Sequence, residues 1–271
     1  MTPRSLPLGS VVVTGAARGI GRGIAELMVR RGHQVVLTDV DGEAARRTAD
    51  AIGAAAGLHQ DVREEASHRA AAEEALRHGP LVAWFNNAGV GNDGTLMDLS
   101  SGSVEQLVHV NLMGVIWGTR AAVDAFGSQG GDIVNTASLS AHGPVPGLSV
   151  YAATKAAVVS LTMSVQVELP RHVRVHALCP DGVDTVMVEE MRDEGRAKAL
   201  VHSGGPLLSV DQVAAEAVAL LGTSRVVRSV PGWRSGLMRF TALTPSVSMR
   251  AERLFLAQGR RRMQKTAAGS S

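Results

Sequence analysis

The sequence predicts a doubly wound α/β fold, in which one parallel β-sheet carries helices on both faces. Short apolar runs of strand length alternate with longer helical segments along the chain, which is the pattern of repeated βαβ units. A glycine-rich turn separates the first apolar run from the first helix. The length of 271 residues is within reach of one large domain with a sizeable core.

About seven runs have the length and apolar character of strands that are buried on both faces. Right-handed crossovers between them place the intervening helices on both faces of the sheet. The predicted strands span Ser10–Thr14, Gln34–Thr38, Gly57–Gln60, Leu81–Phe85, Asp132–Thr136, Val173–Leu178 and Arg225–Val230. The predicted helices span Gly19–Arg31, Ala44–Ile52, Glu64–His78, Ser103–Phe126, Tyr151–Leu169 and Val210–Leu221.

The composition is typical of a globular protein, because 45% of the residues are hydrophobic and 19% are charged. The single cysteine, Cys179, excludes an internal disulfide, and the histidines show no pair at metal-ligand spacing, so no metal is expected. The N-terminus lacks the apolar segment of a signal peptide. No uninterrupted apolar run reaches the ~18 residues of a spanning helix. We therefore expect a cytoplasmic protein.

Charge is unevenly distributed along the chain. Residues 231–271 contain eight basic residues and one acid, a net charge of +7, and taking this from the whole-chain charge of +2 leaves −5 for residues 1–230. The sequence thus divides into a mildly acidic domain over residues 1–230 and a basic C-terminal extension over residues 231–271.

The extension interleaves apolar residues with arginines, and two interpretations remain open. It folds over the domain or across an oligomer interface, or it is an amphipathic segment that makes peripheral contact with an anionic membrane. Nucleic acid is not expected as a partner, because the run Arg260–Arg262 is short and the rest of the chain is acidic.

The turn after the first predicted strand reads TGAARGIG over residues 14–21, with glycines at Gly15, Gly19 and Gly21. Glycines at such positions let backbone N–H groups and a helix N-terminus approach an anion. A glycine triplet is also compatible with a plain tight turn. Its place between the first strand and the first helix favours the phosphate-binding interpretation.

Asp39 closes the second predicted strand, where an acid accepts hydrogen bonds from the ribose of a bound dinucleotide. Its carboxylate would repel a 2′-phosphate, so NAD is favoured over NADP. Arg18, in the glycine turn, argues weakly the other way, since a cation there could contact that phosphate.

With these features, the chain resembles the short-chain dehydrogenase/reductase family over about residues 8–230. The family's motifs occur in the same order in this sequence. They are the glycine turn, Asp61-Val62 after the third strand, Asn86-Asn87-Ala88-Gly89 after the fourth, Asn111 in the long helix, Ser138 after the fifth strand, and Tyr151-x-x-x-Lys155 in the helix that follows.

The resemblance implies a Rossmann-type NAD-binding catalytic domain and a homo-oligomer, either a tetramer or a dimer. It implies cofactor contacts for Gly15, Arg18, Gly19, Ile20, Gly21, Asp39, Asp61, Val62, Asn87, Ala88, Gly89, Tyr151, Lys155, Val183 and Thr185.

One motif departs from the family. After the sixth strand the family usually reads P-G-x-V-x-T, whereas this chain reads Pro180-Asp181-Gly182-Val183-Asp184-Thr185. The resemblance assigns Val183 and Thr185 to the nicotinamide end of the cofactor. Asp181, in the glycine slot, therefore places a carboxylate near that end, where it could stabilise the oxidised, positive form.

Tyr151 and Lys155 are four residues apart on a predicted helix, so their side chains share one face. A free phenol has a pKa of ~10, and a nearby ammonium lowers it toward the operating pH of a general acid or base. Tyr151 is the one tyrosine in the chain. An isolated pair with this spacing is usually a solvated helix face, so the family motifs carry the functional interpretation.

The resemblance implies roles for the neighbouring residues. Ser138 would orient the substrate oxygen, with Ser140 as a close competitor, and Asn111 would order a water that connects Lys155 to solvent. Ser140, His142, Met187 and Met191 are candidates for the substrate pocket, and the methionines suit an adaptable apolar wall.

We therefore expect an NAD-dependent oxidoreductase that transfers a hydride between nicotinamide and an alcohol or ketone, with an apolar secondary alcohol favoured. The alternative is a catalytically weak sensor or scaffold that keeps the cofactor-binding fold.

Overall fold

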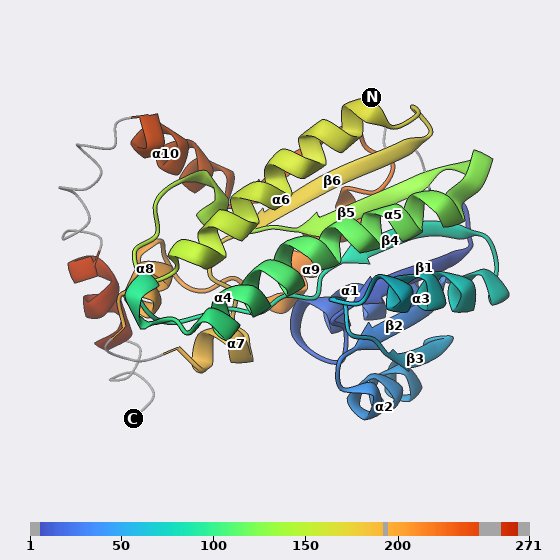
Figure 1. The fold of residues 1–271 in the computed structure, drawn as a ribbon, viewed down its shortest axis with the longest axis horizontal. Coiled ribbons are helices and arrows are strands. Elements are labelled where there is room, and N and C mark those ends of the chain that lie inside the picture. The colour runs from blue at the N-terminus through green and yellow to red at the C-terminus, as the bar shows by residue number, and fades with distance from the viewer. Residues whose placement is uncertain (1–5, 192–194, 244–255, 265–271) are drawn as a thin grey trace.

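The computed structural model describes residues 6–191, 195–243 and 256–264. Its core is a seven-stranded sheet with the order β3-β2-β1-β4-β5-β6-β7, in which every neighbouring pair is parallel (Figure 1). The prediction of one doubly wound parallel sheet with helices on both faces is confirmed. The strands are β1 (Ser10–Thr14), β2 (Gln34–Asp39), β3 (Ala56–His59), β4 (Leu81–Asn86), β5 (Gly131–Thr136), β6 (Val173–Pro180) and β7 (Val227–Val230).

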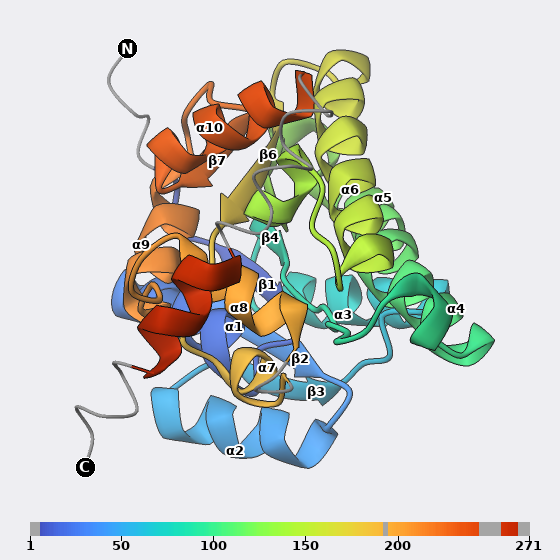
Figure 2. The ribbon, with the colours of Figure 1, turned by 90° about the vertical axis from the view of Figure 1, so that its left-hand side faces the viewer.

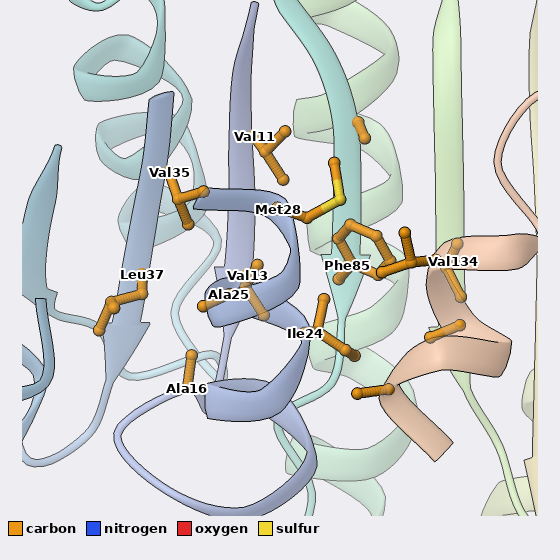
Figure 3. Close-up of a cluster of buried hydrophobic side chains, with 14 of the residues drawn as sticks. Val11, Val13, Ala16, Ile24, Ala25, Met28, Val35, Leu37, Phe85 and Val134 are labelled. Carbon is orange, nitrogen blue, oxygen red and sulfur yellow. The ribbon is translucent and has the colours of Figure 1, made fainter. Parts of the chain in front are cut away.

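Alternating side chains of the strands bury two separate apolar layers. Val11 and Val13 of β1 pack against α1 (Gly19–Arg30) on one face (Figure 3). Val12 belongs to the apolar cluster on the other face. On the first face, α1 is accompanied by α2 (Gly42–Ile52) and α9 (Val210–Ala219). Each fully buried valine or leucine of this layer contributes about 1.5–3 kcal/mol to stability.

The opposite face is covered by α3 (Glu65–Arg77), α5 (Gly114–Phe126) and α6 (Ser149–Glu168). Trp84 of β4 is fully buried beneath this layer, and its ring nitrogen donates to Asn86 Oδ1 at 2.8 Å. A side chain at Gly118 of α5 would collide with that same oxygen. The close approach of α5 to β4 therefore depends on glycine at this position.

The predicted helix over Ser103–Phe126 is wrong in one respect, because it is not continuous α-helix. It consists of α4 (Ser101–Val108), a π-helical turn (His109–Met113) and α5. Asn111 lies in the π turn, where its side chain bonds to the backbone of Val90 in the loop after β4. Such π turns often place a polar side chain at a functional site. The other predicted elements differ from the observed ones by a few residues at their ends.

Three further helices gather at the end of the sheet to which the strands point: α7 (Val186–Glu189), α8 (Arg196–Ser203) and α10 (Gly232–Leu243) (Figures 1 and 2). Residues 256–264 are helical and lie against α8. In its described part, the basic extension thus packs on the domain. The division at residue 230 remains a prediction.

One helix of the described residues, α6, is long and apolar enough by length and composition to cross a membrane. It contains the buried Lys155 and packs on β6 through Val158 and Val159. These contacts are those of a core helix.

Near the residues at which β5 and β6 begin, a buried ion cluster joins the two strands. Asp132 is fully buried, accepts hydrogen bonds from Arg174 at 2.6 and 2.8 Å and from the Gly222 N–H at 3.0 Å, and lies 3.0 Å from His176 Nε2. Burial raises the pKa of Asp132, but the hydrogen bonds of His176 and Arg174 and the guanidinium charge outweigh it, so that the net pKa is lowered.

We predict that Asp132→Asn lowers the free energy of unfolding by about 3 kcal/mol, because it leaves a partly buried guanidinium without its carboxylate. Because the pKa of Asp132 is lower in the folded state, its contribution is present at neutral pH and is lost as the pH falls below the unfolded value. Urea unfolding at pH 7 and at about pH 2.5, below the unfolded pKa of 3.8, measures both effects. Glu216→Gln, in the more exposed pair with Arg228, is the control and should cost less than about 1 kcal/mol. An equal loss in the two variants would contradict the prediction.

Candidate active site

The carboxyl ends of strands β1 to β6 surround a cavity of about 870 Å³. Strand β1 has β2 on one side and β4 on the other, because the chain runs from β1 outward to β2 and β3 and then crosses back to β4. In open α/β sheets a crevice forms at this switch point and binds ligands. The cavity extends from Asp39 at one end to Met238 of α10 at the other.

The three glycines of the turn after β1 have different tasks. A side chain at Gly15, where φ is +62°, would lie 2.6 Å from Ala88 Cα, and one at Gly21 would collide with the Gly15 carbonyl. These two glycines let the turn, α1 and the loop after β4 touch. Gly19, with φ at +57°, lines the cavity, and a Cβ there would meet a single atom within 4 Å, a methyl group of Thr185. The first turn of α1 has no side-chain cap. The N–H donors of this turn therefore face the open space at Gly19, and a phosphate group could bind there.

The far end of the cavity carries the acids predicted for the adenosine side. Asp39 accepts hydrogen bonds from the backbone N–H groups of Ala17, at 3.1 Å, and Asp41, at 3.2 Å, which hold its carboxylate at the cavity edge beside Arg18. Asp61 forms an ion pair of 2.5 Å with Arg63. The hydrogen bond from Arg63 lowers the pKa of Asp61. Asp61 therefore neutralises the charge of Arg63 at this end of the cavity.

The loop after β4 is tied to β1 by the Thr14 hydroxyl. This hydroxyl accepts the N–H groups of both Asn87 and Ala88 at 3.1 Å, and Asn87 Nδ2 donates back to the Gly15 carbonyl at 3.0 Å. A Cβ at Gly89 would lie 3.3 Å from Asn111 Oδ1 and 3.5 Å from Lys155 Nζ. The loop therefore passes within van der Waals distance of the site without a side chain in the way.

Tyr151 and Lys155 both line the cavity from the first turns of α6, and the Lys155 ammonium lies 5.7 Å from the centre of the Tyr151 ring. Lys155 is 3% exposed, and its Nζ donates to the Thr136 carbonyl at 2.8 Å. Ser138 follows β5 and lies near enough to the Tyr151 phenol to lower the pKa of that phenol, while its Oγ accepts the Ser140 N–H at 3.1 Å. The structure thus brings the three predicted side chains together.

The expected lowering of the phenol pKa by Lys155 is not found in the protein alone. Burial raises the pKa of Tyr151, and the hydrogen bond with Ser138 lowers it only in part. Lys155 is itself desolvated, which lowers the pKa of its ammonium to about 8, and its proton is directed at the Thr136 carbonyl. The phenol is therefore a proton donor at neutral pH.

Asn111 is fully buried, and its side chain is committed to the protein. Its Oδ1 accepts the Val90 N–H at 2.9 Å, and its Nδ2 donates to the Val90 carbonyl at 2.9 Å and to Thr154 Oγ1 at 3.4 Å. These bonds hold the loop after β4 against α6. The water-ordering role of Asn111 remains a prediction.

The remaining candidates fall into two groups. Ile20, Val62, Val183, Thr185, Ser140, Met187 and Met191 line the cavity as expected. His142 lies outside the lining: it is 9% exposed, its Nε2 is 3.1 Å from Ser229 Oγ, and burial lowers its pKa. The single cysteine, Cys179, is buried in β6, and burial raises the pKa of its thiol to about 12. Such a thiol is inert as a nucleophile at neutral pH.

Sequence reasoning missed the walls that α8 and α10 supply. Leu200, Val201 and Ser203 of α8 and Arg234, Leu237 and Met238 of α10 line the cavity. One signal was available: Asp181, an acid in the family's glycine slot, needs a counter-charge. In the structure Arg234 supplies it, so the Asp181 carboxylate is not a free charge beside the nicotinamide end.

Comparison with known proteins agrees with the site. The model of the short chain dehydrogenase family matches residues 10–196. A sorbitol dehydrogenase from Cereibacter sphaeroides is 39% identical over 180 residues, which are 65% of this chain and 70% of that protein. A probable oxidoreductase of Mycobacterium tuberculosis is 32% identical over 257 residues, and the match spans 80% of this chain and 43% of that longer protein.

Two solved structures are similar along most of the chain. A short chain dehydrogenase/reductase from Burkholderia phymatum in complex with NAD has a TM-score of 0.78 and 29% identity, covering 90% of this chain and 96% of its own. A 3-ketoacyl-(acyl-carrier-protein) reductase from Brucella melitensis complexed with NADH has a TM-score of 0.76 and 33% identity, covering 85% and 100%.

The chain therefore belongs to the short-chain dehydrogenase/reductase family of oxidoreductases. The residues present fit a nicotinamide dinucleotide, because the position at Gly19 is open and the N-terminus of α1 has no side-chain cap.

The low pKa of Lys155 predicts how the free energy of unfolding of the cofactor-free protein depends on pH. This pKa falls from 10.5 in the unfolded chain to about 8 in the folded one, so the unfolded chain binds more protons between these values. The free energy of unfolding should therefore rise by about 3 kcal/mol across this window.

Lys155→Met should remove that rise. The measurement is urea unfolding of both proteins at pH 8 and pH 10.5, because the difference between them isolates this residue from other titrations. A difference that does not change with pH would contradict the low pKa of Lys155.

Proposed function

We propose that this protein is an NAD-dependent alcohol dehydrogenase or carbonyl reductase that acts on an apolar secondary alcohol or its ketone. The observation that carries the proposal is the cluster of Ser138, Tyr151 and Lys155 on one cavity wall, opposite the open glycine turn. The bound nicotinamide would accept or supply the hydride.

Each side chain of the cluster has a task that its contacts support. In ketone reduction, the protonated Tyr151 phenol donates its proton to the substrate oxygen, and in alcohol oxidation the phenolate takes the proton back. Ser138, which lies beside the phenol, orients the substrate oxygen. Lys155, whose Nζ donates to the Thr136 carbonyl, holds positive charge 5.7 Å from the centre of the phenol ring and would bind the hydroxyls of the nicotinamide ribose. A raised phenol pKa favours reduction near neutral pH and oxidation at alkaline pH.

The substrate is proposed to be apolar because of the side chains around the reacting end. Val145, Leu148, Met187, Leu237 and Met238 line this part of the cavity. Of the charged groups in this lining, Asp181 and Arg234 are paired with each other, and Glu190 is exposed to solvent. An uncharged, hydrophobic alcohol would bury its surface against these walls without leaving a charge unpaired.

NAD is proposed over NADP because of Asp39. Its carboxylate is fixed by two backbone N–H groups at the cavity edge, so it would accept the ribose hydroxyls and repel a 2′-phosphate. A cytoplasmic homo-oligomer, with or without peripheral membrane contact, remains our expectation for this chain.

We predict that Tyr151→Phe lowers kcat for hydride transfer by at least about 100-fold, because it removes the proton donor. NADH binding, followed by fluorescence titration, should be retained. A panel of secondary alcohols and ketones with NAD and NADH identifies the substrate for this assay. Activity retained in Tyr151→Phe would contradict the mechanism. A wild-type protein that binds NADH but transfers hydride to no member of the panel would favour a sensor or scaffold instead.

We predict that Asp39→Asn lowers the ratio of kcat/KM with NAD to kcat/KM with NADP by at least about tenfold, because the repulsion of the 2′-phosphate is lost. Asp41→Asn is the matched control: Asp41 is a neighbouring acid that caps α2 through the Ala44 N–H and lies outside the cavity. A wild-type enzyme that prefers NADP would refute this interpretation of Asp39.

A further inference from the structure

Asp181 occupies the family's glycine slot for a reason other than backbone shape. Among the described residues every positive φ belongs to a glycine, so the loop at Asp181 does not need one. The Asp181 N–H donates to the Val230 carbonyl at 2.8 Å and extends the pairing of β6 with β7. The distinguishing property of this position is therefore its carboxylate.

That carboxylate meets a guanidinium of the C-terminal extension. Arg234 Nη1 donates to Asp181 Oδ2 at 2.5 Å, and the two side chains are 13% and 16% exposed. Arg234 Nη2 donates to the Leu200 carbonyl at 3.2 Å and to Ser203 Oγ at 2.9 Å. One guanidinium thus joins three segments: the loop after β6, α8 and α10.

The space for this guanidinium is provided by Gly204. A Cβ at Gly204 would lie 1.1 Å from Arg234 Nη1, so no larger residue fits beside the arginine. The backbone of Gly204 has a φ of −80°, which any residue can adopt, so the glycine is required for room alone. Asp181, Gly204 and Arg234 are therefore complementary in charge and in volume.

Further contacts hold the same two helices in place. Arg262 Nη1 donates to the Ser203 carbonyl at 2.8 Å, and residues 256–264 approach α8 so closely that a side chain at Gly259 would strike the Ala199 carbonyl. On the other side, a Cβ at Gly143 would lie 3.2 Å from the Met238 carbonyl, which places α10 against the turn that follows Ser138.

Arg234, Leu237 and Met238 are at helical positions i, i+3 and i+4, so they share the face of α10 that lines the cavity. The position of Arg234 consequently sets the position of the two apolar side chains. The same guanidinium sets the position of α8, whose Leu200 and Val201 form the adjacent wall.

We propose that Asp181 and Arg234 are a positioning pair that fixes α8 and α10 as permanent walls of the substrate pocket, so that the C-terminal extension determines which substrates fit. The inference rests on the proposed function for its effect on substrates, but the pinning of the two helices can be measured without turnover.

The first test separates substrate fit from chemistry. Asp181→Asn and Arg234→Gln each leave one partner of the pair, and we expect KM for a bulky apolar alcohol to rise at least about tenfold while kcat changes by less than about threefold. The double variant, which pairs two neutral amides, should lose less than the product of the single losses. Arg234→Lys keeps the charge but not the fork that reaches three acceptors, so it should rescue KM only in part.

The second test follows the helices directly. In the single variants, backbone amides of α8 and α10 should exchange with deuterium at least about tenfold faster, and those of α1 should not change. The matched control is the double variant Glu216→Gln with Arg228→Gln. Arg228 donates two hydrogen bonds to the Glu216 carboxylate, at 2.7 and 2.8 Å, and this ion pair joins α9 to β7 outside the cavity. This control variant should leave both KM and the exchange of α8 and α10 unchanged.

The outcomes distinguish this inference from the proposed function. Unchanged exchange in α8 and α10, with NADH binding and turnover intact, overturns the positioning pair and leaves the proposed function standing. Faster exchange in a protein that transfers hydride to no alcohol supports the pair and refutes the proposed function. If kcat and KM both fall in the single variants, and the losses in the double variant are additive, Asp181 and Arg234 act in the chemistry and the proposed positioning role is wrong.

Discussion

The contact between the turn after β1 and the loop after β4 is the constraint on which the site depends. Two strands that are neighbours in the sheet but distant in sequence end here, and the Thr14 hydroxyl binds two successive N–H groups of the β4 loop. Gly15 allows the two backbones to touch. The loop then continues past Gly89, whose lack of a side chain leaves room for Lys155 and Asn111. A bulkier residue at Gly15 would push the two backbones apart, and one at Gly89 would crowd Asn111 and Lys155.

The electrostatics of the site follow from this close packing. Lys155 is buried deeply enough that desolvation brings its pKa to about 8, and the same burial raises the pKa of Tyr151. The protein alone therefore holds the phenol in its protonated form, and the phenolate needs further positive charge to stabilise it. The phenol and the ammonium face a cavity whose remaining wall is the open glycine turn, so the charge that completes the site has to arrive with a ligand. This explains why the pair by itself, without the turn, is weak evidence for an enzyme.

The parts of the fold and site that could be predicted are those that obey a local rule. Apolar runs such as Val11–Val13 are specified by burial on both faces of the sheet, and Tyr151 and Lys155 are specified by helical spacing. The π turn at Asn111 could not be predicted, because it depends on Val90, which is distant in sequence. The exclusion of His142 from the cavity likewise depends on Ser229, a partner on β7. Contacts between distant segments decide these cases, and no periodic pattern records them.

Asp181 shows how a departure from a motif can be informative in the same physical terms. An acid that is buried to this extent is unstable without a counter-charge, so its presence in a glycine slot requires a cation from elsewhere in the chain. Arginine is more frequent after residue 231 than before it, with seven arginines and one acid in the last 41 residues, and Arg234 is the first of the seven. The burial of Asp181 and the positive charge of residues 231–271 together indicate that the extension folds onto the loop after β6. The remaining arginines on exposed positions, such as Arg239 and Arg260, are under no such constraint from the cavity.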